Sequence, residues 1–107
     1  MLNKRKFYIN GQWVDPIKSN DCNVINPSTE ENCAVISIGS KEDINLAVKS
    51  AKDAFNEWAF TSKEEKIKLL ETLYSNYKKR WADIANAITM EMGAPKDFAT
   101  KLQAGTG

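Results

Sequence analysis

The chain has 107 residues, of which 42% are hydrophobic and 27% are charged, and its formal net charge is +1. This length suits one small domain, and the composition is typical of a folded globular protein. The balanced charge argues against nucleic-acid or membrane-surface partners, and no apolar run approaches the about 20 residues that a membrane helix needs. The basic N-terminus lacks the apolar stretch of a secretory signal, so we expect a cytoplasmic location.

The histidine and cysteine content excludes several kinds of site. Histidine is absent and there are two cysteines, so Ser-His, Cys-His and His-ligated zinc sites cannot form within this chain. A hairpin centred between Cys22 and Cys33 would place them opposite each other, so a cross-strand disulfide is geometrically conceivable. A cytosolic location favours two reduced core residues instead. Neither cysteine has a basic sequence neighbour that would activate it as a nucleophile.

The first third of the sequence predicts two β-hairpins. In residues 7–14, Asn-Gly lies between two β-prone triplets, which is the pattern of a type I′ turn. Residues 22–25 and 33–38 form two further apolar stretches. Residues 26–29, Asn-Pro-Ser-Thr, join them, and proline fixes φ there and favours a turn. We therefore expect a second hairpin.

From Ser40 onward the apolar residues recur with a helical period. Ser40 and Asp43 fit a capping box, which predicts the start of a helix that ends near Ala59. Its apolar face carries Ile44, Ala47, Val48, Ala51, Phe55 and Trp58. Trp58 and the later Trp81 both lie on apolar helix faces, so we expect both in the core.

A second N-cap pattern at residues 61–65 opens a longer apolar stripe. That stripe comprises Ile67, Leu70, Tyr74, Tyr77, Trp81, Ile84, Ala85, Ile88 and Met92. Its length exceeds that of most globular helices, so we expect a break near residues 79–81. Gly93 suits a helix C-cap. Pro95 suits the start of a fourth helix, with Phe98, Ala99 and Leu102 along its inner face.

No set of residues fits a catalytic centre. Residues 105–107, Gly-Thr-Gly, lack the preceding strand, third glycine and following helix of a dinucleotide fingerprint. Glu64, Glu65 and Glu71 suit helix capping and i,i+4 pairing better than acid–base catalysis. We therefore predict no catalytic, cofactor-binding or metal residue in this chain. The sequence stops without a cap or closing strand, as expected for a truncation.

Several segments, in this order, resemble the N-terminal segment of the NAD(P)-dependent aldehyde dehydrogenase superfamily. They are FYINGQWV, VINPSTEE, SKEDINLAVKSAKDAFNEW, TSKEEKIKLLETL, WADIANAITMEMGAP and KDFATKLQAGTG, and they cover residues 7–107. The resemblance implies an α/β fold of two hairpins and about four amphipathic helices. Residues 1–107 would form the opening of a Rossmann-like cofactor-binding domain with an incomplete sheet, without the catalytic and oligomerisation domains.

The resemblance also implies an activity for the intact enzyme. A cysteine thiolate attacks a small-molecule aldehyde to form a thiohemiacetal, and NAD or NADP accepts the hydride. Water or coenzyme A then releases a carboxylic acid or an acyl thioester. The residues that do this lie beyond position 107, so Cys22 and Cys33 are not the nucleophile. We expect the chain alone to be inactive and to bind no cofactor. The intact enzyme is expected to be a homodimer or homotetramer.

Two alternatives remain open. In some family members, two strand carbonyls and a carboxylate hold a structural monovalent cation, and the matching residues here are Val24, Ile25 and Glu91. We prefer to interpret Val24 and Ile25 as ordinary strand residues and Glu91 as a surface or capping residue. For function, the chain could instead be a freestanding helical interaction module that docks on a full-length partner. A nucleic-acid role ranks third.

Overall fold

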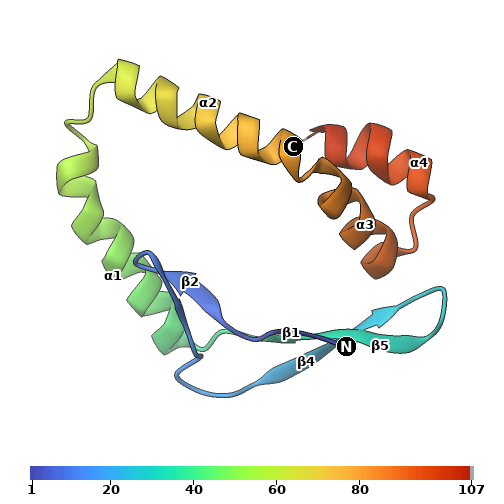
Figure 1. The fold of residues 1–107 in the computed structure, drawn as a ribbon. Helices are drawn as coiled ribbons and strands as arrows, with labels where there is room; N and C mark the ends of the chain where they lie inside the picture. The colour runs from blue at the N-terminus through green and yellow to red at the C-terminus, as the bar shows by residue number, and fades with distance from the viewer. Residues whose placement is uncertain (107) are drawn as a thin grey trace. The chain divides into compact units, whose positions relative to one another are not determined.

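The computed structural model describes residues 1–106 and has an α/β architecture (Figure 1). The chain divides into two compact units. The first comprises Met1–Val24 and Asn32–Thr61, and the second comprises Ile25–Glu31 and Ser62–Gly107. The predicted α/β class with two hairpins and four helices is confirmed, although a further strand and two helical turns were not expected.

The first hairpin has the predicted turn. Strands β2 (Phe7–Ile9) and β3 (Gln12–Val14) pair antiparallel, with Tyr8 opposite Trp13. Asn10 and Gly11 have φ values of 52° and 74°, the left-handed conformation that a type I′ turn requires at both positions. The rings of Tyr8 and Trp13 lie 5.2 Å apart between centroids. Helix α1 (Lys41–Trp58) contacts β2 in the same unit (Figure 1).

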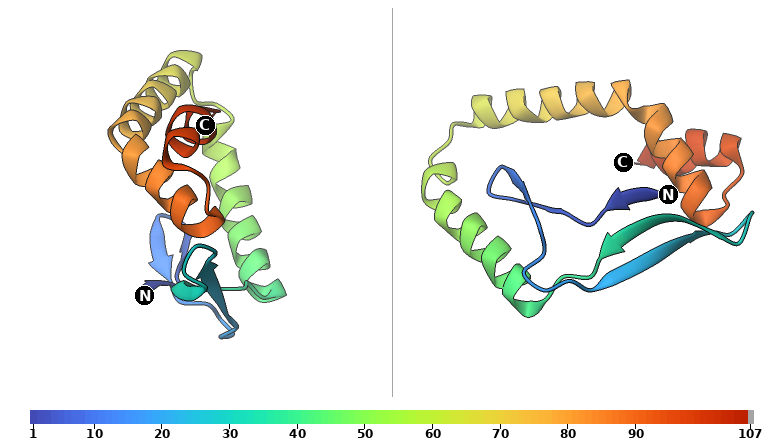
Figure 2. Two further views of the ribbon diagram at one scale, coloured as in Figure 1. Left: turned by 90° about the vertical axis from the view of Figure 1, so that its right-hand side faces the viewer. Right: turned by 60° about the horizontal axis from the view of Figure 1, so that its bottom comes forward.

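The second hairpin belongs to a three-stranded sheet in the order β1-β5-β4. β4 (Asp21–Asn26) and β5 (Glu31–Ser37) run alongside each other, as the right-hand view of Figure 2 shows. β1 (Leu2–Lys4) pairs parallel to β5, with Leu2 opposite Ala34. The sequence did not predict β1, because its three exposed residues carry no apolar alternation.

The turn between β4 and β5 is organised by Asn26. Its carbonyl accepts the backbone N–H groups of Thr29 (3.3 Å) and Glu30 (2.8 Å). Its side-chain Oδ1 accepts the N–H of Ser28 at 2.9 Å, which is an Asx turn. Glu30 leaves the turn with φ 58°. The predicted role of the Asn-Pro-Ser-Thr segment as a turn is confirmed.

The helix boundaries follow the predicted caps. α1 begins after the Ser40–Asp43 capping box and is followed by Ala59 as its C-cap. α2 (Lys63–Lys79) begins after a second capping box made by Ser62 and Glu65. α3 (Trp81–Met92) follows a break at Arg80, where the chain changes direction (Figure 2). Gly93 ends α3 with φ 68°, as the predicted left-handed cap requires.

The fourth helix departs from the expected regular helix. α4 (Lys96–Phe98) continues as a π-helical turn, η1 (Ala99–Gln103), and then as a 3₁₀ turn, η2 (Ala104–Thr106). Two aromatic residues hold these turns from outside the segment. The Tyr77 hydroxyl donates to the Ala104 carbonyl at 2.7 Å, and Trp81 Nε1 donates to the Thr100 carbonyl at 2.8 Å.

Small residues make up most of what is buried. Among residues 1–106, the buried hydrophobic residues are Ala34, Val35, Ala85, Ala99 and Ala104. Trp81 is half-buried and packs against the alanine cluster of the second unit, which agrees with its predicted core position. Trp58 is 47% exposed, so its predicted core position is wrong within this chain. The expected inner face of the fourth helix is also wrong for Phe98 and Leu102, which are exposed, and right for Ala99.

Candidate functional site

Asp43 is the most enclosed charged residue in the described part of the chain. It is 4% exposed, and its Oδ1 accepts the Ile17 N–H at 2.9 Å. Its Oδ2 accepts both the N–H and the hydroxyl of Ser40, at 2.8 and 2.7 Å. These hydrogen bonds, that from Ile17 first, lower the pKa of the carboxyl below its ordinary value. Asp43 therefore ties the connector after the first hairpin to the start of α1.

The same hydrogen bonds bear on cofactor binding. Gly39 and Ser40 lie between β5 and α1, which is where a dinucleotide-binding fold places its phosphate loop. Here the Asp43 carboxylate already occupies the helix N-terminus and accepts from Ser40. A second anion at this position would meet a negative charge, so these residues do not fit a cofactor phosphate.

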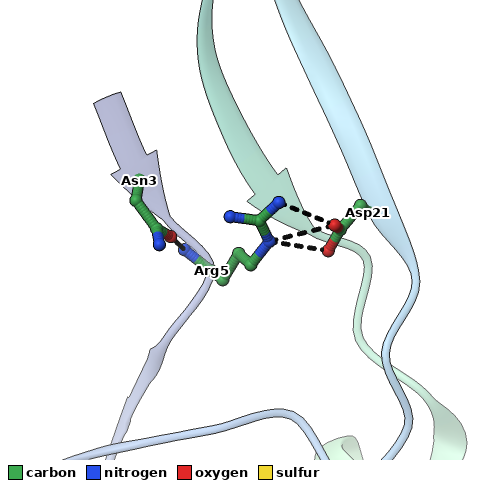
Figure 3. Close-up of polar contacts among 3 residues, drawn as sticks. All are labelled: Asn3, Arg5 and Asp21. Carbon is green, nitrogen blue, oxygen red and sulfur yellow. Dashed lines mark hydrogen bonds and ion pairs between the residues drawn. The ribbon is translucent and has the colours of Figure 1, made fainter. Parts of the chain in front are cut away.

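Arg5 forms a two-pronged ion pair with Asp21 (Figure 3). Its Nε lies 3.0 Å from both carboxylate oxygens, and Nη2 lies 2.8 Å from Oδ2. The hydrogen bond from Arg5 lowers the pKa of Asp21. The ion pair holds Arg5, which follows β1, against the first residue of β4. The Arg5 backbone N–H also donates to Asn3 Oδ1 at 3.3 Å. The guanidinium is thus committed to a structural contact.

Both cysteines are free thiols that contact backbone carbonyls. Cys33 Sγ donates to the Val24 carbonyl at 3.3 Å, and Cys22 Sγ donates to the Asn23 carbonyl at 3.7 Å. The expected reduced state agrees with the structure, and the disulfide alternative does not. Both residues are half-buried and lie in strands, as predicted.

The possible cation ligands are divided between the units. Val24 belongs to the first unit, where its carbonyl accepts the Cys33 thiol, whereas Ile25 and Glu91 belong to the second. Glu91 is exposed near the end of α3. No cluster of three or more His, Cys, Asp or Glu side chains suited to a metal ion occurs within residues 1–106. The cation site therefore stays a prediction.

Other residues singled out in the sequence have structural roles. Glu65 closes the capping box of α2, as expected, because it accepts from the Ser62 hydroxyl at 2.8 Å. Gly105 lies in η2 against the ring of Trp81, with a distance of 3.5 Å from the ring to the position of a Cβ. Gly107, the last residue of the Gly-Thr-Gly segment, lies outside the described residues. Within residues 1–106 no helix has the length and apolarity required to cross a bilayer.

Sequence reasoning missed the contacts that join distant residues. Ile17 and Asp43 are 26 positions apart, and Arg5 and Asp21 are 16 apart. Asp43 was predicted only as a capping residue, because no local sequence pattern indicates its second partner, Ile17. The alternation of acidic and basic residues along the chain would have allowed many pairings other than Arg5 with Asp21.

Comparison with known proteins decides the family. The sequence model of the aldehyde dehydrogenase family matches residues 13–106. The chain belongs to the aldehyde dehydrogenase family. The resemblance noted from the sequence motifs is thereby confirmed.

Individual aldehyde dehydrogenases match nearly the whole chain. A 3-succinoylsemialdehyde-pyridine dehydrogenase from a Pseudomonas species is 44% identical over 100% of this chain and 23% of its own length. The crystal structure of an aldehyde dehydrogenase from Bartonella henselae superposes with a TM-score of 0.97 at 53% identity. That match covers 99% of this chain and 22% of the Bartonella chain. This chain therefore spans about a fifth of the length of these relatives.

A further solved structure carries bound small molecules. It is aldehyde dehydrogenase C from Pseudomonas syringae, in a cysteine-to-alanine variant with NAD+ and octanal. Its TM-score is 0.92 at 36% identity, over 94% of this chain and 21% of that chain.

Proposed function

We propose that residues 1–107 form the N-terminal part of the cofactor-binding domain of an NAD(P)-dependent aldehyde dehydrogenase. The single observation that carries this proposal is the TM-score of 0.97 at 53% identity with the Bartonella henselae enzyme. At that similarity the backbone of this chain follows one continuous part of an aldehyde dehydrogenase. The contacts found here support a structural task for it, because Asp43, Arg5 and the Cys33 thiol each join segments that are distant in the sequence.

The intact enzyme oxidises an aldehyde through a cysteine thiohemiacetal. NAD(P)+ would accept the hydride, and water or coenzyme A would then attack the enzyme thioester, which frees the cysteine thiol and gives a carboxylic acid or an acyl thioester. A related enzyme was crystallised with octanal and NAD+ after a cysteine had been replaced by alanine, which supports the role of a cysteine. Residues 1–107 contain neither the catalytic cysteine of this enzyme nor the residues that bind the cofactor and form the oligomer. Those residues belong to other parts of the enzyme. The assembled enzyme is a cytoplasmic homodimer or homotetramer.

A graft tests this proposal. Residues 1–107 replace the matched segment of the Bartonella henselae aldehyde dehydrogenase, and the product is called the grafted enzyme. We expect it to reduce NAD+ or NADP+ in the presence of an aldehyde drawn from a panel of aliphatic and aromatic compounds. The same enzyme without the segment, and the 107-residue chain alone, are expected to show no turnover.

Two results would count against the proposal. One is a soluble grafted enzyme that oxidises no aldehyde which the parent enzyme oxidises. The other is aldehyde-dependent reduction of NAD+ by the purified 107-residue chain, since this would place a catalytic centre within it.

A further inference from the structure

The turn of the first hairpin contains the one Asn-Gly pair of the sequence, Asn10 and Gly11. Both residues are exposed. Asn10 also borders a groove of about 260 Å³ that residues of the hairpin and of α1 line together, so water reaches its side-chain amide. Glycine has no Cβ that would hinder its own backbone nitrogen. Among the residues that follow an asparagine in this chain, Gly11 therefore has the least hindered main-chain nitrogen.

We propose that Asn10 is a deamidation site and that opening of the β2–β3 hairpin limits the rate of its modification. The Gly11 nitrogen, after its proton has passed to hydroxide, attacks Asn10 Cγ. The new C–N bond closes a five-membered succinimide ring, and the Cγ–Nδ2 bond breaks to release ammonia, which takes a proton from water.

Water then opens the succinimide in one of two ways. Addition of water at Cγ gives aspartate. Addition at the main-chain carbonyl carbon gives isoaspartate, in which the main chain continues through the side-chain carbon. Water and base are the only other reactants, so the reaction does not depend on aldehyde dehydrogenase activity.

The folded turn holds the reacting atoms apart. Asn10 and Gly11 have φ values of 52° and 74°, as in a type I′ turn, whose first central residue has ψ of about 30°. That ψ places the Gly11 nitrogen and the Asn10 Cβ on opposite sides of the Asn10 Cα–C bond. A five-membered ring requires both on the same side, so the succinimide can close only after the turn has opened.

The hairpin around this turn is small enough to open locally. Strands β2 and β3 have three residues each, and a two-stranded hairpin is only marginally stable by itself. Its cross-strand aromatic pair, Tyr8 and Trp13, is 63% and 68% exposed. Such segments open at free energies below that of global unfolding. The turn therefore slows the reaction without preventing it.

Peptide mapping tests both the site and the role of hairpin opening. The 107-residue chain and a peptide of residues 6–15 are kept in the same mildly alkaline buffer. Mass spectrometry follows each fragment that contains asparagine, and chromatography separates aspartate from isoaspartate. We expect Asn10 to be modified first among the asparagines of the chain, at a rate at least about fivefold lower than in the peptide. Asn26 is the internal control, because Pro27 has no N–H and cannot attack.

Trp13→Ala tests the role of hairpin opening separately. It removes the ring contact with Tyr8, so the hairpin opens more often. The rate at Asn10 in the chain is expected to rise about threefold, and the rate in a peptide with the same substitution is expected to stay unchanged. Amide hydrogen exchange in residues 7–14 of the chain is expected to rise by the same factor as the rate at Asn10.

Asn10→Gly is the matched control variant. Gly-Gly also accepts the positive φ values of a type I′ turn, so amide exchange in residues 7–14 is expected to stay within about twofold of that in the unsubstituted chain. The modification at position 10 is expected to disappear.

Four results would overturn the proposal. One is modification of another asparagine before Asn10, and a second is an equal rate at Asn10 in the chain and in the peptide. A third is a Trp13→Ala chain in which amide exchange speeds up while the rate at Asn10 does not. If Trp13→Ala unfolds the chain, the rate at Asn10 must rise to that of the peptide, and a lower rate is the fourth such result.

Discussion

Asp43 shows how one carboxylate can join a local and a distant part of the chain. Its contact with Ser40 is a helix cap within four residues, whereas its contact with Ile17 fixes a connector 26 positions earlier. All three hydrogen bonds, that from Ile17 first, are stronger to the ionised carboxylate than to the neutral acid, so they lower the pKa of the carboxyl. The residue therefore makes the start of α1 sensitive to acid.

Asp43→Asn is expected to reduce the stability of the grafted enzyme and to flatten its pH dependence in acid. A lowered folded-state pKa means that the unfolded chain binds the proton first as the pH falls. The contribution of Asp43 is therefore fully present above the unfolded pKa of about 4, and it is lost as the pH falls through the folded value. Thermal unfolding from about pH 6 to pH 3 checks this, with Asp53→Asn as an exposed control. If the stability of the two variants depends on pH in the same way, the hydrogen bonds of Asp43 are not the source of its acid sensitivity.

Gly93→Ala is expected to be more damaging than Gly11→Ala. Both glycines have positive φ, 68° and 74°, so each substitution costs about 1–2 kcal/mol in backbone strain. At Gly93 the new Cβ would also lie 2.9 Å from Pro27 Cγ, whereas nothing lies within 4 Å at Gly11. We expect at least about 1 kcal/mol of additional loss at Gly93. Urea unfolding of the two variants of the grafted enzyme measures this difference, and equal losses would show that the Pro27 contact yields without cost.

At the scale of elements, the caps and turns were predictable because their partners are close in sequence. Ser40 with Asp43, Ser62 with Glu65, and the Asn10-Gly11 turn each depend on residues within four positions. The π-helical turn η1 was not predictable in this way. Its Thr100 carbonyl accepts from Trp81, 19 positions earlier, and the Ala104 carbonyl directly after it accepts from Tyr77, 27 positions earlier. Strand β1 likewise depends on pairing with β5, which is about 30 residues away.

Tyr77→Phe is expected to make local opening of η1 and η2 more frequent. It removes the hydroxyl that donates to the Ala104 carbonyl and leaves that buried residue with an unpaired acceptor, at a cost of about 1 kcal/mol. Amide hydrogen exchange in residues 99–106 is then expected to accelerate about fivefold. Tyr74→Phe is the matched control, because the Tyr74 ring is exposed and its contact with the Lys78 ammonium, at 4.4 Å, persists with phenylalanine. Unchanged exchange in Tyr77→Phe would show that Trp81 alone suffices.

At the scale of the whole molecule, the apolar faces of the helices exceed what the chain itself buries. Among the described residues, Val35 is the largest side chain that is fully buried, whereas Phe55 is 62% exposed and Trp58 is 47% exposed. Sequence periodicity predicts which side of a helix is apolar, but it does not record how much of that side is buried. Trp81 packs against the alanine cluster of its unit and met the core expectation, whereas Trp58 is exposed and did not.

The 107-residue chain alone is expected to unfold with weak cooperativity and to scatter light on heating. Its exposed apolar faces favour association, and a small alanine-rich core gives little cooperative stability. A thermal melt followed by circular dichroism and static light scattering checks this. A monodisperse chain with one sharp, reversible transition would instead favour a freestanding interaction module.

The sequence by itself determined the capping boxes, both hairpin turns, the break at Arg80 and the family, because local hydrogen bonds and ordered motifs need only neighbouring residues. The tertiary structure alone decided the β1–β5 pairing, the Arg5–Asp21 ion pair, the second partner of Asp43 and the π-helical turn. It also decided which apolar residues are buried. The physical reason is that burial and long-range pairing depend on what lies opposite a residue in space, and a periodic pattern records only which side of an element is apolar.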